Sequence, residues 1–254
     1  MLRLELFGGL QVWVDDRLVL HPGTTRRKAS ALLVYLYLKR GRYIGRDELY
    51  EALWPEAVHQ PAGRLKQTVL VLRRLLGRSE IILESGGSYH FNGLVEYWSD
   101  LEQFEQERLA ARSLLVQGES AQALAHFEAA LALRRGDLVP ELAYEPWLAR
   151  EAERNRADYL DTLDETARLL ADRGDVGAAI GTLEQAIREE PLREHSHLEL
   201  MRLLRRVGRD VDALRLYEGL QRRLAQRLQV APGLELIELY HAIRNERTPP
   251  RRAG

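Results

Sequence analysis

The 254-residue sequence contains no cysteine. The chain therefore cannot form disulfides or thiolate metal sites, and it has no cysteine nucleophile. Its longest unbroken apolar run, residues 31–38, is much shorter than the roughly 20 residues of a membrane-spanning helix. The first residues, MLRLELFGG, also lack the positive segment followed by an apolar one that marks a signal peptide. We therefore expect a cytoplasmic protein without a membrane partner.

The motifs of common enzyme classes are also missing. The sequence has no GxxxxGK[ST] loop, no HExxH and no GxSxG. His195 and His197 form a short HxH pair. Side chains two residues apart on a helix point about 200° away from each other, which does not suit a shared metal ion, so we expect surface or packing roles for both histidines. Acidic pairs such as Asp161 and Asp164 are expected on exposed helix faces. We therefore predict no enzyme, and neither a metal nor a cofactor.

The net charge of the chain is small, but its charged residues are unevenly distributed. The net charge is −1, which argues against a general polyanion binder. Residues 1–98 hold 14 Lys and Arg against 10 Asp and Glu, a net charge of +4. Subtracting these from the totals of 37 and 38 leaves 23 against 28, a net charge of −5, for the remainder. The first part of the chain is therefore the one suited to binding phosphates.

The first hundred residues predict a fixed order of elements. Residues 1–20 alternate as short strands with a turn at Asp15-Asp16. After Pro22-Gly23, Thr24 or Thr25 can cap a helix that runs to about Lys39, followed by a short helix from Arg46 to Leu53. A loop that begins at Trp54, itself expected in the core, leads to a third helix. The motif SGGS then predicts a hairpin. We expect inward-facing side chains in the first helix at Ala29, Leu32, Leu33, Leu36 and Tyr37.

The third helix, within residues 61–78, has two contrasting faces. Leu65, Val69, Leu72 and Leu76 fall in one narrow sector, which is typical of a core-facing stripe. The opposite side is basic and polar, and no acidic residue occurs between Glu56 and Glu80. Such a face is either ordinary solvated surface or a DNA-reading surface. The order of helices followed at once by a hairpin favours the second interpretation, because it is the order of a winged helix.

From residue 99 onward the sequence predicts amphipathic helices with an internal repeat. Gly174 and Gly208 head similar segments 34 residues apart, the tetratricopeptide period, and Gly118 heads a third segment. Pro191 stands where such a repeat ends its second helix, and residues 134–147 insert a loop. Core positions are expected at Ala123, Phe127, Ala130, Ala179, Leu183, Ala186, Ala213, Tyr217 and Leu220. We also expect core packing for Tyr144, Trp147 and Tyr159.

These segments resemble a known family. Residues 24–56, with LKQTVLVLRRLLG and GGSYHF, look like the OmpR/PhoB-type winged helix at the front of bacterial SARP-type regulators. Residues 189–243 resemble the bacterial transcriptional activator domain that follows it. The resemblance implies an α+β N-terminal winged helix-turn-helix domain, residues 1–97, followed by an all-α tetratricopeptide-like helical repeat domain, residues 98–246. Residues 247–254, RTPPRRAG, are expected to be a disordered tail. No receiver domain precedes the winged helix and no ATPase follows, so the chain resembles the short, stand-alone members, unless it was cut from a longer one.

The same resemblance implies a sequence-specific transcription activator. Such a protein binds direct repeats in double-stranded promoter DNA, usually as a homodimer, and recruits RNA polymerase. The loop at residues 54–62 of this sequence occupies the position that meets the polymerase in OmpR-like proteins. Val71 stands where relatives often carry arginine, and Ser85 and Glu84 make the expected wing contact weak. By position, the DNA-binding residues are Arg64, Lys66, Gln67, Thr68, Val71, Arg74, Arg46 and Ser85.

An alternative remains open. The repeats could form a protein-binding or small-ligand-sensing scaffold with a weak or vestigial DNA-binding domain. The basic residues that could line such a site, or simply be solvated, are Arg205, Arg206, Arg209, Arg222 and Arg223. A scaffold would tolerate the loss of Arg64, Gln67 and Arg74, whereas an activator would not.

Overall fold

The computed structural model describes residues 1–23, 26–56 and 63–247. The chain forms two compact units. The N-terminal unit consists of Met1–Glu107 and Ala132–Arg156, and the repeat unit consists of Arg108–Leu131 and the chain from Ala157 onward. The predicted division near residue 97 stays a prediction.

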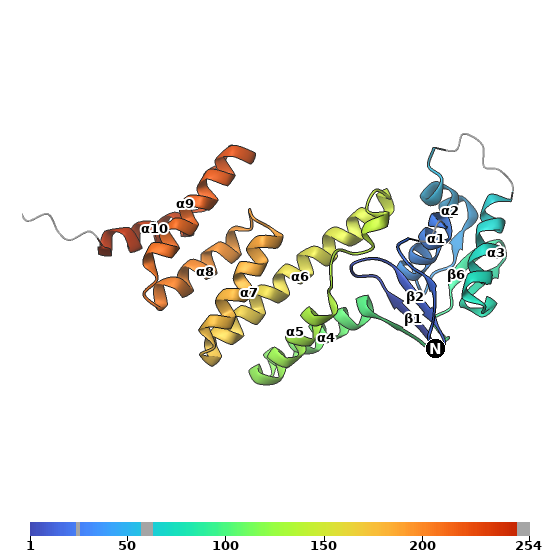
Figure 1. Cartoon of the computed structure of the whole chain (residues 1–254), viewed down its shortest axis with the longest axis horizontal. Helices are drawn as coiled ribbons and strands as arrows, with labels where there is room; N and C mark the ends of the chain where they lie inside the picture. The colour runs from blue at the N-terminus through green and yellow to red at the C-terminus, as the bar shows by residue number, and fades with distance from the viewer. Residues whose placement is uncertain (24–25, 57–62, 248–254) are drawn as a thin grey trace, which may run out of the picture. The chain divides into compact units, whose positions relative to one another are not determined.

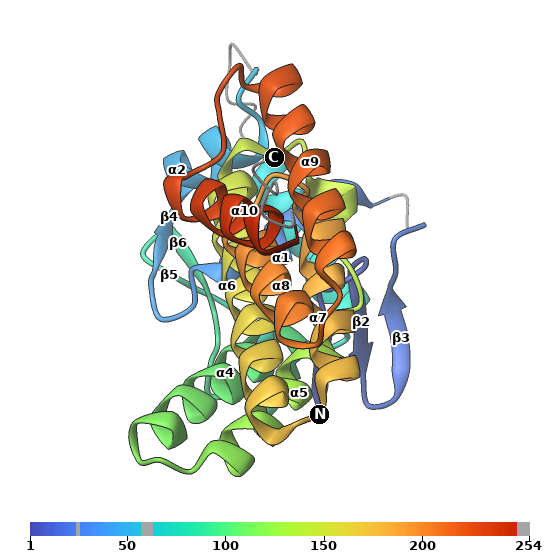
Figure 2. The ribbon, with the colours of Figure 1, turned by 90° about the vertical axis from the view of Figure 1, so that its left-hand side faces the viewer.

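A four-stranded sheet opens the N-terminal unit. Its strands are β1 (Leu2–Glu5), β2 (Gln11–Val14), β3 (Arg17–Leu20) and β7 (Tyr97–Ser99), in the order β3-β2-β1-β7. Figure 2 shows β2 and β3 side by side, and their connection is the predicted Asp15-Asp16 turn. Both aspartates have positive φ, 47° and 64°, which short polar side chains tolerate in tight hairpin turns.

A buried carboxylate fixes the end of β1. Asp100, the first residue of α4 (Asp100–Val116), is completely buried and accepts backbone N–H groups from Leu6 at 2.8 Å and Phe7 at 3.1 Å. Burial raises the pKa of Asp100, and these backbone hydrogen bonds oppose the rise. The contact joins residues more than ninety positions apart, so it ties β1 to the beginning of the helical region.

The inserted segment at residues 134–147 also packs on this sheet. Leu138 bridges to Phe7, and the Leu10 N–H donates to Glu141 at 2.7 Å. A short 3-10 helix, η2 (Pro140–Leu142), lies within the segment. The prediction that Tyr144 is a core residue is wrong, since the residue is 90% exposed, whereas Trp147 packs edge-to-face on Tyr35. Sequence spacing could not place Tyr144, because the segment follows no helical period.

Further helices and a second, small sheet belong to this unit (Figure 1). The helix α1 (Arg27–Leu38) is buried from Ala29 to Tyr37, rather than on one face as predicted, because α3 (Arg64–Leu76) and β6 (Ser88–Phe91) both pack against it. Thr24 and Thr25 lie outside the described residues. Trp54 is half-buried and packs near the Tyr50 ring. The elements are α1 (Arg27–Leu38), β4 (Ile44–Gly45), α2 (Arg46–Leu53), α3 (Arg64–Leu76), η1 (Ser79–Ile81), β5 (Ile82–Ser85) and β6 (Ser88–Phe91), with sheet order β4-β6-β5.

The predicted glycine repeat is confirmed as a repeated helix end. Gly118, Gly174 and Gly208 all have positive φ, between 74° and 95°. After each of them, the next N–H donates to a leucine carbonyl five residues upstream, at 2.8–2.9 Å. This is the hydrogen bond of a Schellman motif, in which glycine adopts the left-handed conformation that ends a helix. The helices around these turns are α4, α5 (Ser120–Leu133), α6 (Pro146–Arg173), α7 (Val176–Glu189), α8 (Glu194–Arg206), α9 (Asp210–Arg227) and α10 (Leu234–Arg247).

The nine small and large apolar positions predicted for the repeat core are all buried. Small alanines allow paired helices to approach, and the larger side chains fill the space between them. The expected exposure of Asp164 is wrong, since its side chain is buried against Arg193 and Ser196. His197 is also fully buried, while the side chain of His195 is largely exposed.

The described part of the chain has neither a membrane-spanning helix nor a cluster of metal-binding side chains. No helix there combines the length and the low polarity needed to cross a membrane. Across residues 1–23, 26–56 and 63–247, no group of three His, Asp or Glu side chains is arranged to hold a metal ion. Of the predicted tail, Arg247 is the last residue of α10, and residues 248–254 lie outside the described residues.

Candidate nucleic-acid interface

The helix α3 is delimited by glycine at both ends. Gly63 and Gly77 flank it in the left-handed conformation, and the first helical hydrogen bond runs from the Gln67 N–H to the Gly63 carbonyl at 2.8 Å. The predicted apolar stripe, which includes Leu65 and Leu72, is buried. The stripe therefore fixes which side of α3 is turned outward.

The outward side carries most of the residues predicted to contact DNA. Arg64, Lys66, Gln67 and Arg74 are exposed, while Val71 is partly covered. Within the described residues, no carboxylate pairs with the three cations of this set. With no such partner among the described residues, their charges are left to solvent and counterions, the state from which a phosphate contact releases counterions.

Thr68 lies on the same helix, but its hydroxyl already donates a hydrogen bond within that helix. Its hydroxyl donates to the Arg64 carbonyl one turn earlier, at 2.9 Å. Such bonds are common for threonine in helices and leave only the oxygen lone pairs free. Thr68 can therefore accept a hydrogen bond from a base or a sugar, but it has no free proton to donate.

Two other cations within residues 61–78, Arg73 and Arg78, form contacts with other residues of the protein. Arg73 donates from Nε and Nη2 to the Ile82 carbonyl, at 3.1 and 2.8 Å. Arg78 pairs with Glu80 at 2.9 Å. Neither residue presents a free guanidinium, and charge counts alone could not separate them from Arg74.

The side chain of Arg46, which is predicted to contact DNA, forms an ion pair with an acidic residue. Arg46 Nη2 lies 3.2 Å from Glu84 Oε1, and both side chains are about half exposed. Glu84 belongs to β5, next to Ser85 at the hairpin tip, where Gly86 and Gly87 have positive φ. The Arg46 guanidinium also approaches Gly87, since a Cβ there would lie 3.5 Å from its central carbon. The hairpin therefore shields part of the Arg46 charge.

A shallow groove of about 350 Å³ runs between α3 and the hairpin. Lys66 and Gln67 line it from α3, and Glu84 and Tyr89 line it from the hairpin. Burial and the adjacent Glu84 raise the pKa of Tyr89, so its hydroxyl stays protonated at neutral pH. Exposed Leu70 also lines the groove, whereas helical periodicity places it only at the edge of the outer face. An apolar side chain there can contact a thymine methyl group.

Three relatives place the chain among known proteins. Regulatory protein AfsR of Streptomyces coelicolor is 31% identical over 245 residues, which cover 95% of this chain and 24% of AfsR. Transcriptional regulatory protein EmbR of Mycobacterium bovis is 30% identical over 251 residues, which cover 94% of this chain and 62% of EmbR. The solved structure of Mycobacterium tuberculosis EmbR in complex with a low affinity phosphopeptide is 28% identical, with a TM-score of 0.81. That alignment covers 97% of this chain and 66% of the EmbR chain.

These relatives are longer proteins. The chain spans about a quarter of the length of AfsR and less than two thirds of the length of EmbR. The family described as bacterial transcriptional activator domain matches residues 99–244. Because the matched residues make up more than half of the sequence, the chain belongs to the bacterial transcriptional activator domain family.

Proposed function

We propose that the chain is a sequence-specific transcription activator that binds promoter DNA through a winged helix in its N-terminal unit. In this proposal α3 is the recognition helix in the major groove, and the β5–β6 hairpin is the wing. The observation that carries the proposal is the outer face of α3, on which Arg64, Lys66 and Arg74 are exposed cations without a carboxylate partner among the described residues.

The exposed side chains have distinct roles in this proposal. Gln67 can form a bidentate pair with adenine, and Arg64 or Arg74 can contact guanine or phosphate. Each good base contact contributes roughly 1–3 kcal/mol of discrimination. Lys66 carries a flexible point charge suited to phosphate, so it would add affinity rather than specificity.

The wing contributes little to affinity in this proposal. Glu84 neutralises Arg46 and would repel a phosphate, and Ser85 adds no charge. Affinity should therefore depend mainly on α3, and its decrease with salt should be modest for a DNA-binding protein.

Binding to direct repeats as a homodimer and recruitment of RNA polymerase are further parts of the proposal. They rest on the similarity to AfsR and EmbR, both named as regulatory proteins. Protection of two half-sites about one helical turn apart in a footprint would support paired binding. Stimulated transcription from that promoter with purified polymerase would support recruitment.

The decisive experiment is a gel shift on the promoter DNA upstream of the protein's own operon, at two salt concentrations. We expect the wild type to form a discrete complex that resists competitor DNA. The variants Arg64→Ala/Arg74→Ala and Gln67→Ala should lose this site preference without a change in thermal stability.

The matched control is Arg215→Ala/Arg222→Ala, which removes the same charge from exposed positions on α9. It should bind DNA like the wild type. If wild type and all variants fail on this promoter and on DNA selected from random sequence, the proposal is rejected in favour of a scaffold built on the repeats.

A further inference from the structure

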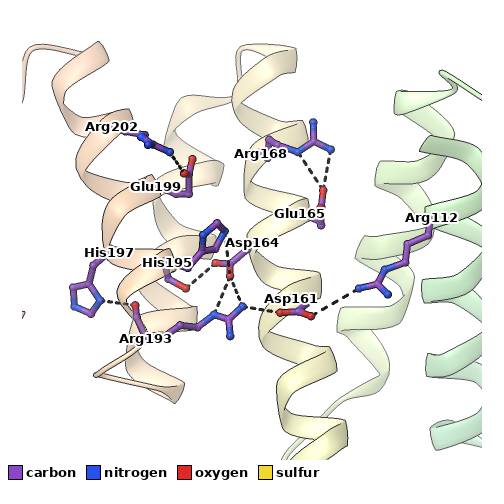
Figure 3. Close-up of polar contacts among 11 residues, drawn as sticks. Arg112, Asp161, Asp164, Glu165, Arg168, Arg193, His195, His197, Glu199 and Arg202 are labelled. Atoms are coloured by element: carbon purple, nitrogen blue, oxygen red, sulfur yellow. Dashed lines mark hydrogen bonds and ion pairs between the residues drawn. The ribbon is translucent and has the colours of Figure 1, made fainter. Parts of the chain in front are cut away.

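A charged groove of about 620 Å³ lies within the repeat unit (Figure 3). One face of α6 and one face of α8 form its two walls, and Arg112 of α4 lies at one side. Its apolar floor includes Ala167, Leu183 and Leu203, all of which are buried. The volume is within the range of small-molecule sites in proteins, roughly 300–1,000 Å³.

Two arginines from the α8 side reach across this groove to α6. At one end Arg193, just before α8, reaches Asp161 at 2.7 Å and Asp164 at 2.9 Å. At the other end Arg206 donates to the Ala171 carbonyl at 3.0 Å. Along α6 the lining residues run from Asp161 to Asp172, an advance of about 16.5 Å at 1.5 Å per residue. That length accommodates a compact ligand but not a long extended peptide.

Between these ends, each wall carries an ion pair formed within its own helix. Glu165 and Arg168 pair on α6 at 2.8 Å, and Glu199 and Arg202 pair on α8 at 2.6 Å. Arg168 also lies 3.5 Å from Asp172, and Arg202 lies 3.1 Å from Glu235 of α10. Figure 3 shows the two pairs on neighbouring helices, and both arginine side chains are 51% exposed. Pairs of this kind contribute only about 0.3–0.5 kcal/mol, so a ligand can replace either partner at low cost.

The lining is balanced in charge. Five arginines and five Asp or Glu side chains line the groove. A ligand with a single charge would be attracted by one half of each pair and repelled by the other half. A ligand with both charges can use the arginines and the glutamates together, and its apolar part can cover the floor.

We propose that this groove binds a small zwitterion of dipeptide size with apolar side chains. Its carboxylate pairs with Arg168 and Arg202, its ammonium group pairs with Glu165 and Glu199, and its side chains contact Leu183 and Leu203. The guanidinium fork suits a carboxylate because it can donate two parallel hydrogen bonds. The proposal does not depend on DNA binding, since every residue that it uses lies in the repeat unit.

The test uses the dipeptide L-leucyl-L-phenylalanine and calorimetric titration of the full chain. We expect saturable binding that becomes about tenfold weaker or more in Arg168→Gln/Arg202→Gln and in Glu165→Gln/Glu199→Gln. These side chains are partly exposed, so both variants should keep the wild-type unfolding temperature within a few degrees. The control Arg215→Gln/Arg222→Gln changes two arginines outside this groove and should bind the dipeptide like the wild type.

Derivatives of the dipeptide that are blocked at one end test the carboxylate contact and the ammonium contact separately. The C-terminal amide lacks the carboxylate, so it should bind weakly to the wild type and be insensitive to Arg168→Gln/Arg202→Gln. The N-acetyl dipeptide lacks the ammonium group and should be insensitive to Glu165→Gln/Glu199→Gln. Glycylglycine keeps both charges without apolar side chains and should bind more weakly than the parent dipeptide.

Three results would overturn the proposal. One is the absence of saturable binding by the parent dipeptide. Another is equal affinity of the blocked and parent peptides, which would indicate simple apolar contact. The third is tighter binding of the N-acetyl form than of the parent, which would identify the site as one for organic anions.

Discussion

Arg73 and Ile82 join the proposed recognition helix to the hairpin, because two guanidinium nitrogens of Arg73 donate to one carbonyl oxygen, that of Ile82. The neighbouring Arg74 is exposed and has no carboxylate partner among the described residues. Two adjacent arginines of one helix thus have different tasks. Arg73 holds the hairpin against α3, whereas the exposed Arg74 is the arginine proposed to contact DNA.

This contrast predicts opposite effects of the same substitution. Arg73→Met should lower the free energy of unfolding by about 1–3 kcal/mol, because it leaves the Ile82 carbonyl without its charged donor. Arg74→Met should leave stability unchanged and weaken DNA binding directly. Urea unfolding measured beside a gel shift separates the two effects. Equal stability of both variants would show that the bond to Ile82 contributes nothing to the fold.

The Arg46–Glu84 pair predicts a gain of function. Glu84→Gln removes a negative charge from the hairpin and frees Arg46 for a phosphate, so DNA affinity at low salt should rise. One additional phosphate contact should steepen the slope of log affinity against log salt by about 0.9. The control Glu128→Gln removes the same charge from exposed α5 and should leave the slope unchanged. An unaltered slope in Glu84→Gln would place the wing away from DNA.

Local patterns in the sequence predicted much of this structure. The stripe of Leu65 and Leu72 was predictable because helical periodicity alone determines which side chains share a face. The turn at Gly208 was predictable because few residues other than glycine adopt the left-handed conformation. The helical repeat is therefore confirmed, while the DNA contacts of α3 stay a prediction.

Features that depend on tertiary partners were not predictable. Asp161 and Asp164 differ in burial because only Asp164 faces both Arg193 and Ser196, which approach it from a distant part of the sequence. The role of Arg73 depends on a backbone carbonyl in another element. Neither periodicity nor composition carries this information. The dipeptide-sized groove was missed for the same reason, since its walls come from segments about thirty residues apart.

The glycines of the repeat predict a paired test of backbone conformation. Gly208 has φ of 74° and open space where a Cβ would lie, so Gly208→Ala should cost about 1–2 kcal/mol from backbone strain alone. Gly181 lies within α7, also in open space but without a positive φ. Gly181→Ala should therefore stabilise the chain by about 0.5–1 kcal/mol. Chemical unfolding checks both signs, and destabilisation by both variants would contradict this account.

The buried His197 predicts how stability depends on pH. Burial lowers the pKa of His197 below its ordinary 6.5, and Arg223 lowers it further, while the Arg193 carbonyl and Glu194 act in the opposite direction. Its Nδ1 lies 2.9 Å from the Arg193 carbonyl and donates to it, and Nε2 is buried without a hydrogen-bond partner among the described residues. The folded chain therefore holds this imidazole neutral in the range where the unfolded chain begins to protonate it.

The sign of the effect follows from proton binding. Below pH 6.5 the unfolded state binds more protons at His197 than the folded state, so the free energy of unfolding should fall as the pH falls. His197→Leu removes this contribution, and its stability should decline less than that of the wild type between about pH 7 and pH 5. Replacement of exposed His241 by Gln is the matched control and should leave the decline unchanged. Parallel pH profiles of the wild type and His197→Leu would mean that this histidine is protonated as readily in the folded chain as in the unfolded one.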